Sequence, residues 1–168
     1  MKIIAINGSP HGEWGSCSHL IKNMFSECEK LGAETEVIRL IKKNINYCLG
    51  CGKCMSEGVC PQKDDVHEIH EKMKAADGIV FASPVYVLHV TGLLKNFIDR
   101  CLPMGHRPCL HGKYAASVSA FAGIGDIDMV ADYMTRPLVG VKFIKFRKII
   151  MNPIGNNHKM GQQECVGK

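Results

Sequence analysis

Short apolar runs alternate with segments of helical periodicity over most of this chain, and no other feature of the sequence constrains its fold as strongly. The first run, Ile3-Ile4-Ala5-Ile6, lacks the alternation of a half-exposed strand, as expected for a strand buried on both faces of a sheet. The predicted strands are residues 3–6, 36–41, 78–82, 114–120 and 142–150, and the predicted helices are residues 18–31, 65–75, 91–101 and 126–138. Because crossover connections between parallel strands are right-handed, we predict an α/β fold with a doubly wound, five-stranded parallel sheet.

The length of the chain, 168 residues, suits one domain with a substantial core. We predict that this domain covers residues 1–152 and that residues 153–168 form an irregular tail, because the end of the chain is polar and glycine-rich and has no helical period. A sheet of this kind usually ends with a helix that covers one face, and the sequence indicates no such helix. Two interpretations stay open: the chain is cut short, or a partner subunit covers that face.

The composition excludes several classes of partner. The formal net charge is +5, but the basic residues are dispersed and not interleaved with aromatic residues, so we expect no nucleic-acid partner. No apolar run is long enough to span a membrane, and the N-terminal run resembles a strand entering a turn rather than a signal peptide. We therefore expect a cytoplasmic protein without a membrane partner. In that reducing compartment, nine cysteines indicate metal or redox chemistry rather than disulfides.

Four of the cysteines form one compact run, which Pro61 follows. The gaps between them are two, two and five residues. The bacterial ferredoxin run C-x2-C-x2-C-x3-C-P has the same first two gaps and the same proline, with a shorter last gap. Three thiolates at this spacing can turn inward around one small inorganic core, and Gly50 and Gly52 let the backbone curl around it. We interpret the run as a [4Fe–4S] site with four local ligands: Cys48, Cys51, Cys54 and Cys60.

Three other interpretations of this cysteine run compete. Thiolates also suit zinc, although structural zinc sites usually join two C-x2-C pairs from separate parts of the chain. A redox-active C-x-x-C pair is the second alternative. The third is a loop of thiols without any ligand.

The loop after the first strand, residues 8–18, is rich in hydroxyl groups and opens a helix. Free N–H groups and the positive end of the dipole at a helix N-terminus favour an anion, and Ser9, Ser16 and Ser18 add donors without adding charge. The loop matches neither a Walker A sequence nor a Gly-x-Gly-x-x-Gly turn. We predict a phosphate site here; the alternative is that Ser16 or Ser18 only caps the helix.

The third strand ends in Ser83-Pro84-Val85-Tyr86, and the stretch after the fourth contains Gly123. Proline and glycine let the backbone approach a flat ring closely, and a tyrosine can stack on it. Ligands of a doubly wound sheet lie beyond the carboxyl ends of the strands, so these loops and the phosphate loop are predicted to form one crevice for a phosphate-bearing cofactor.

Residues 8–18, together with the Ser83-Pro84-Val85-Tyr86 turn and the following residues 92–100, resemble the NAD(P)H-dependent FMN reductase group of flavodoxin-like proteins. The cysteine run is similar to that of the iron-sulfur flavoproteins within this group. The resemblance covers about residues 1–125. It implies a flavodoxin-like sheet with a cysteine-rich loop, residues 47–61, inserted after the second strand. It also implies a dimer or tetramer in which each cluster lies near a flavin across a subunit interface.

By motif match, the resemblance assigns contacts with FMN residue by residue. The residues that it places at the phosphate are Ser9, Pro10, Ser16 and Ser18. The residues that it places at the isoalloxazine ring are Pro84, Val85 and Tyr86, with Gly123 at the other edge of the ring.

The leading functional hypothesis is a redox flavoprotein that carries FMN and one [4Fe–4S] cluster, with a ferredoxin-like electron donor and a small-molecule acceptor. The first alternative is an NAD(P)H-dependent FMN or quinone reductase without a cluster. The others are a non-catalytic flavodoxin-like electron carrier and a zinc-stabilised binding module. No residue is predicted as a general acid or base.

Three smaller predictions concern helical residues. Asp65 and Glu68 have the spacing of a capping box at the start of a helix. His67 and His70 are predicted to lie on a solvated helix face rather than in a metal site. Lys95 and Asp99 are predicted to form a contact one helical turn apart.

Overall fold

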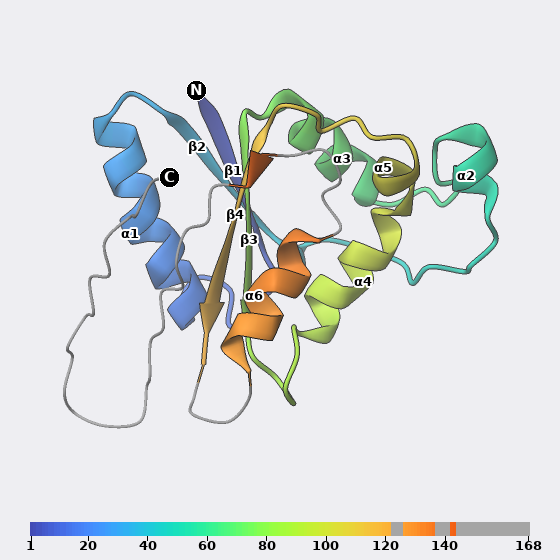
Figure 1. Cartoon of the computed structure of the whole chain (residues 1–168). Helices are drawn as coiled ribbons and strands as arrows, with labels where there is room; N and C mark the ends of the chain where they lie inside the picture. Colours follow the sequence, from blue (N-terminus) through green and yellow to red (C-terminus); the bar gives the residue numbers. More distant parts are fainter. Residues whose placement is uncertain (122–125, 137–141, 144–168) are drawn as a thin grey trace.

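A parallel sheet with helices on both faces forms the body of the chain in the computed structural model (Figure 1), which describes residues 1–121, 126–136 and 142–143. The strands are β1 (Lys2–Asn7), β2 (Glu34–Arg39), β3 (Gly78–Pro84), β4 (Tyr114–Ala120) and β5 (Lys142–Phe143). Their order is β2-β1-β3-β4-β5 and every neighbouring pair is parallel. This is the strand order of flavodoxin, so the predicted flavodoxin-like α/β fold is confirmed.

Four of these strands have six or seven residues, and β5 contributes two. The rest of the predicted strand 142–150 and the predicted tail, residues 153–168, lie outside the described residues.

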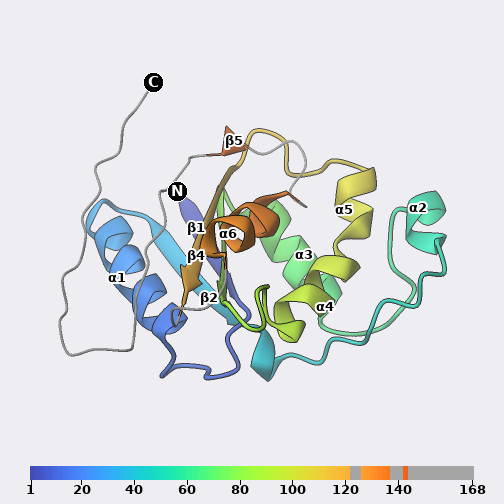
Figure 2. The same ribbon diagram turned by 60° about the horizontal axis from the view of Figure 1, so that its bottom comes forward.

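The helices divide between the two faces of the sheet (Figures 1 and 2). Their bounds are α1 (Ser16–Lys30), η1 (Leu40–Lys42), α2 (Lys53–Glu57), α3 (Val66–Ala75), α4 (Gly92–Arg100), α5 (Leu102–His106) and α6 (Ile127–Thr135). One face is covered by α1 and the other by α3, α4 and α6, while α2 packs on α5 away from the sheet. None of the described helices is long and apolar enough to cross a membrane.

Alternate side chains of the strands β1, β2, β3 and β4 enter two separate cores. On β1, Ile4 and Ile6 face the layer of α3, α4 and α6, and Ala5 faces α1. In the first core, Phe81 of β3 meets Phe97 of α4 edge to face, with ring centroids 6.3 Å apart. All these side chains are buried, which explains why β1 and β3 each contain a continuous apolar run.

The start of α3 differs from the predicted capping box. Asp65 is the N-cap residue, but its side chain makes no cap hydrogen bond. Its Oδ2 accepts instead from the backbone N–H of Asn44 at 2.8 Å. Glu68 forms ion pairs with Lys43 and Lys72. Both carboxylates therefore tie α3 to neighbouring parts of the chain, which a local sequence pattern does not indicate.

Candidate functional site

The loops that follow β1 and β3 begin side by side at one edge of the sheet. Asn7, the last residue of β1, pairs with Ala82 of β3, and the Gly8 N–H donates to the Ala82 carbonyl at 2.8 Å. Strand order reverses here, because β2 lies on one side of β1 and β3 on the other. In a flavodoxin-like sheet this switch point is where the cofactor crevice forms.

The buried side chain of Asn7 shapes the loop after β1. Its Oδ1 accepts from the Ser9 N–H at 2.9 Å, and its Nδ2 donates to Ser18 Oγ at 2.8 Å. The Ser18 hydroxyl in turn donates to the Gly12 carbonyl. Ser18 thus links Asn7 to Gly12 and holds the loop closed. Sequence reasoning missed Asn7, whose position at the end of a strand, before Gly8, was the available signal.

Ser9 and Ser16 lie on either side of the start of α1. The N-cap residue is Gly15, so the alternative in which Ser16 or Ser18 caps the helix is wrong. Ser9 is buried, and its Oγ is so close to Gly15 that a Cβ there would approach it to 2.9 Å. Ser16 is the first residue of α1, where backbone N–H groups have no partner within the helix. Pro10 is exposed in the same loop as Ser9, whereas Ser16 and Ser18 lie in the first turn of α1.

The loop after β3 makes a tight turn with a strained tip. Tyr86 and His89 exchange backbone hydrogen bonds of 2.8 and 3.1 Å. Between them, Val87 and Leu88 have φ angles of 46° and 68°, a region that side chains, and β-branched ones above all, rarely adopt. Val87 is 96% exposed, so packing of its own side chain does not impose this conformation. Positive φ at both central residues is the pattern of a type I′ turn, and the approach of this turn to a ring stays a prediction.

Pro84, Val85 and Tyr86 join this turn to β4. The Val85 N–H donates to the Ala120 carbonyl at 2.8 Å, and the Tyr86 side chain is 41% exposed. Gly123 lies outside the described residues, so its role at the edge of a ring stays a prediction.

Thr91 connects the two loops and was missed as a site residue. It is the N-cap of α4: its Oγ1 accepts from the Leu94 N–H at 3.2 Å and donates to the Gly8 carbonyl at 2.6 Å. Its own N–H donates to Ser83 Oγ at 3.0 Å. A threonine directly before an apolar helical run is a cap signal, so the sequence could have indicated its local role. Its contact with Gly8, 83 residues away, is not indicated by the sequence around either residue.

The four cysteines lie in the segment between η1 and α3, around the short helix α2. Cys48 and Cys51 are exposed, Cys54 of α2 is 9% exposed and Cys60 is half-buried. The glycines of the segment have left-handed backbone conformations, with φ of 61° at Gly50, 72° at Gly52 and 79° at Gly58. Substitutions with a Cβ would be strained at these bends, as predicted for a backbone that curls around its cysteines.

The cysteines are close enough for their charges to interact. Burial, followed by the neighbouring Cys60, Cys48 and Cys51, raises the pKa of the Cys54 thiol. The eight described cysteines all have free thiols. Among the described residues, no three His, Cys, Asp or Glu side chains are arranged to hold a metal ion. The four free thiols fit a thiolate-bound cluster in type and number, and the arrangement of ligands around it stays a prediction.

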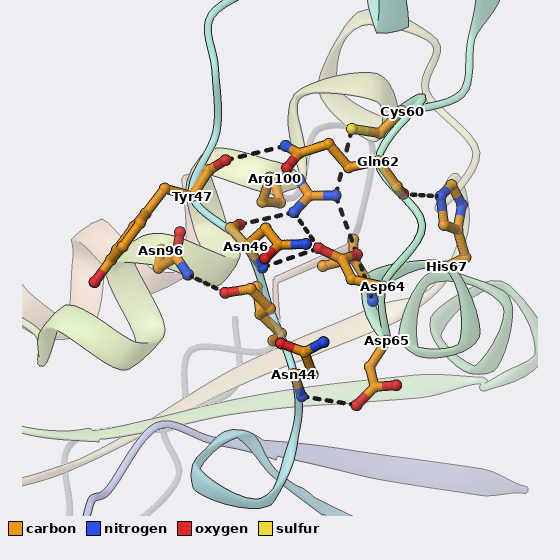
Figure 3. A network of polar contacts seen from close by, with 12 residues as sticks. Asn44, Asn46, Tyr47, Cys60, Gln62, Asp64, Asp65, His67, Asn96 and Arg100 are labelled. Carbon is orange, nitrogen blue, oxygen red and sulfur yellow. Dashed lines mark hydrogen bonds and ion pairs between the residues drawn. The ribbon is translucent and has the colours of Figure 1, made fainter.

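A set of hydrogen bonds closes the cysteine segment at its base (Figure 3). Asp64 Oδ2 accepts from the Asn46 N–H at 2.9 Å, and Gln62 Nε2 donates to the Tyr47 carbonyl at 3.0 Å. Burial alone would raise the pKa of Asp64, but hydrogen bonds from Arg100 and from backbone N–H groups outweigh it and lower that pKa. The two ends of the segment are thus held together while its middle projects outward.

His70 corrects the prediction of a solvated helix face. It is 8% exposed, its ring meets Phe97 edge to face at 6.0 Å, and its Nε2 has no hydrogen-bond partner in the described part of the chain. His67 is half-buried, and its Nε2 lies 2.8 Å from the Gln62 carbonyl. The predicted contact between Lys95 and Asp99 is confirmed, with Nζ to carboxylate distances of 2.5 and 2.7 Å.

His70 should make the stability of the protein depend on pH. Burial, followed by the charges of Lys74, His67 and Arg100, lowers its pKa from 6.5 to about 4, against the opposite effect of Glu71. Between these values the unfolded chain binds a proton that the folded chain does not, so stability falls as the pH drops. Between pH 7 and pH 5 we expect this residue to account for a loss of about 2 kcal/mol in the free energy of unfolding.

Urea unfolding of the wild type and of His70→Leu at both pH values measures this effect, because the variant should lack that part of the dependence. His19→Leu, at an exposed histidine of α1, is the control and should keep the full dependence. A His70→Leu variant with the same pH dependence as the wild type would contradict the assignment.

Comparison with known proteins matches the whole described region. The profile of the NADPH-dependent FMN reductases matches residues 1–153. An iron-sulfur flavoprotein of Archaeoglobus fulgidus is 45% identical over 138 residues, which cover 82% of this chain and 62% of the relative. One of Methanocaldococcus jannaschii is 43% identical over 122 residues, which cover 73% of this chain and 63% of the relative. The chain thus spans less than two thirds of the length of these relatives.

A solved flavodoxin from the domain Archaea superposes on the chain with a TM-score of 0.58 and 15% sequence identity. The superposition covers 91% of this chain and 85% of the flavodoxin, in agreement with the strand order.

Proposed function

The chain belongs to the NADPH-dependent FMN reductase family, and on this premise we propose that it is an oxidoreductase that passes electrons between a [4Fe–4S] cluster and FMN. The electron donor is a ferredoxin-like protein and the acceptor a small molecule. The curated relatives described above carry the name iron-sulfur flavoprotein. The observation that carries the proposal is the presence of four free thiols in one segment of the chain. The same chain has a loop after β1 that leads into the N-terminus of α1, where a phosphate is predicted to bind.

When bound, the cluster transfers one electron at a time and the flavin transfers one or two, so that together they couple one-electron transfer to two-electron transfer. The residues of the chain bind and orient these groups. Ser9, Ser16 and the first N–H groups of α1 hold the phosphate, and Asn7 and Ser18 keep their loop closed. The turn of Pro84, Val85 and Tyr86 borders the ring.

The exposed cysteines support exchange of electrons with another chain. Cys48 and Cys51 are exposed, and Figure 2 shows α2 beyond α4 and α5, away from the sheet. A homo-oligomer, dimer or tetramer, that brings this segment to a flavin of a second subunit fits this placement.

The second candidate is an NAD(P)H-dependent FMN or quinone reductase without a cluster. The description of the family favours it. In that case the reductant is NAD(P)H and the cysteines have no iron.

Anaerobic purification with iron, acid-labile sulfide and flavin assays on one sample separates the two candidates. About four irons per chain, together with stoichiometric FMN, support the two-cofactor proposal. FMN without iron or sulfide, with oxygen excluded throughout, supports the second candidate. Iron without flavin contradicts both.

Gly8 tests the placement of FMN at the switch point. A Cβ at this position would lie 2.6 Å from Leu94 Cβ and 3.2 Å from Thr91 Oγ1, so Gly8→Ala must push the loop away from α4. We expect a loss of about 1–3 kcal/mol in the free energy of unfolding and at least tenfold weaker FMN binding, measured by urea unfolding and by flavin fluorescence. Gly92→Ala, at a glycine whose Cβ would meet no atom within 4 Å, is the control and should change neither.

A further inference from the structure

The guanidinium group of Arg100, near the end of α4, joins both ends of the cysteine segment (Figure 3). Nη1 donates to the Asn46 carbonyl at 2.8 Å and to Asp64 Oδ2 at 2.6 Å. Nη2 donates to Asp64 Oδ1 at 3.1 Å and to Cys60 Sγ at 3.3 Å. One side chain thus contacts Asn46, two residues before the first cysteine of the run, together with Cys60, the last cysteine, and Asp64 beyond it.

Stability alone does not account for this arrangement. The side chains of Arg100 and Asp64 are 1% and 0% exposed, so both charges have lost their hydration. An apolar pair in such a place is often as stable or more stable. Arg100 Nε also has no hydrogen-bond partner in the described part of the chain, which adds to the cost of burial. Besides Asp64 and the Asn46 carbonyl, the guanidinium donates to the sulfur of Cys60, which is one of the predicted cluster ligands.

We propose that Arg100 is a positioning residue that fixes Cys60 for the cluster and raises the reduction potential of the cluster through its hydrogen bond to that sulfur. The inference rests on the proposed function, since it requires a cluster on the four cysteines. Reduction adds negative charge to a group that is already anionic, and a donor aimed at a thiolate sulfur stabilises the reduced form more than the oxidised form. Asp64 moderates this effect because it shares the same guanidinium.

The geometry requires arginine rather than a cation in general. Two parallel N–H···O bonds to Asp64 fix the plane of the guanidinium and leave an N–H of Nη2 directed at Cys60. The ammonium group of a lysine is a point charge and cannot make this fork. Arg100→Lys therefore keeps the charge and removes the geometry.

Redox titration of the anaerobically purified holoprotein tests the proposal. We expect Arg100→Lys to retain four irons and FMN and to lower the reduction potential of the cluster. A tenfold change in the ratio of reduced to oxidised cluster, about 59 mV for a one-electron couple, is the expected size. Asp64→Asn, which keeps an oxygen acceptor but frees the guanidinium from the carboxylate, should shift the potential the opposite way. Arg107→Lys is the control: Arg107 donates to the Ser56 carbonyl of the same segment at 2.5 Å, and its replacement should leave the potential unchanged.

The outcomes separate this inference from the proposed function. A wild-type protein with FMN and no iron refutes the cluster itself. If the wild type has a cluster but the potentials of the variants do not move, or all move in one direction, the role of Arg100 is overturned. The proposed function then still stands. Loss of iron from Arg100→Lys with FMN retained, while Arg107→Lys keeps its iron, supports the positioning of Cys60 by Arg100 and overturns the expected retention of the cluster with a lowered potential. Loss of both cofactors from Arg100→Lys and from Asp64→Asn means that the pair maintains the fold instead, and overturns the inference.

Discussion

The Cys51→Ala variant is expected to lose its iron and sulfide and to retain its full content of FMN. Cys51 is exposed, so its replacement removes no packing from either core. It also lies outside the loop after β1, where the phosphate contacts are predicted. Removing one of four thiolates should prevent assembly of a [4Fe–4S] cluster on the segment, because clusters of this type require four ligands. Iron, sulfide and flavin assays on anaerobically purified protein, and the loss of absorbance in the region of the cluster, measure the result.

Cys109→Ala is the matched control, because Cys109 is also exposed but lies outside the cysteine run. It should keep both cofactors. Iron retained at the wild-type level in Cys51→Ala would contradict the assignment of this cysteine as a ligand. FMN lost together with iron would mean that the cysteine segment and the flavin site fold as one unit.

The fold was predictable because its strands have a strong local signature. Runs such as Ile79-Val80-Phe81 are apolar at every position, since both faces of the sheet are covered, and this continuity distinguishes them from the helices. The two short helices α2 and α5, of five residues each, were not predicted. Elements of this length carry too few residues to establish a helical period, and the N-cap residue of α2, Gly52, is a glycine in the left-handed conformation.

The candidate site was predictable where its residues act locally and not where they act across the chain. Ser9, Ser16 and Ser18 could be found because they are close together in the sequence, in the loop after β1 and the first turn of α1. Arg100 and Asp64 are 36 residues apart, and nothing in either local sequence indicates that they meet. His70 was assigned to a solvated face for the same reason, because only the packing of α4 on α3 buries it against Phe97.

The Asp64→Ala variant is expected to lose about 3–5 kcal/mol in the free energy of unfolding, because it leaves the Arg100 guanidinium buried without its carboxylate. It also removes the acceptor for the Asn46 and Val66 N–H groups, so both ends of the cysteine segment loosen. Urea unfolding of the cluster-free protein, followed by circular dichroism, measures this loss. Fluorescence is less suitable, because the single tryptophan, Trp14, is 95% exposed.

Two variants decide whether the charge pair causes this loss. Asp99→Ala removes a carboxylate that also makes two contacts with one cation, Lys95, but on the exposed face of α4, where its side chain is 44% exposed. It should cost less than about 1 kcal/mol. The double variant Asp64→Leu/Arg100→Met replaces both charges with apolar groups and should recover most of the stability lost in Asp64→Ala, since no charge is then left buried alone. The contrary result is a double variant that loses as much free energy of unfolding as its two single variants lose together. That result would mean that the backbone contacts of Asp64, rather than its pairing with Arg100, hold the base of the segment. The redox titration of Arg100→Lys would then be the more direct measure of the role of Arg100.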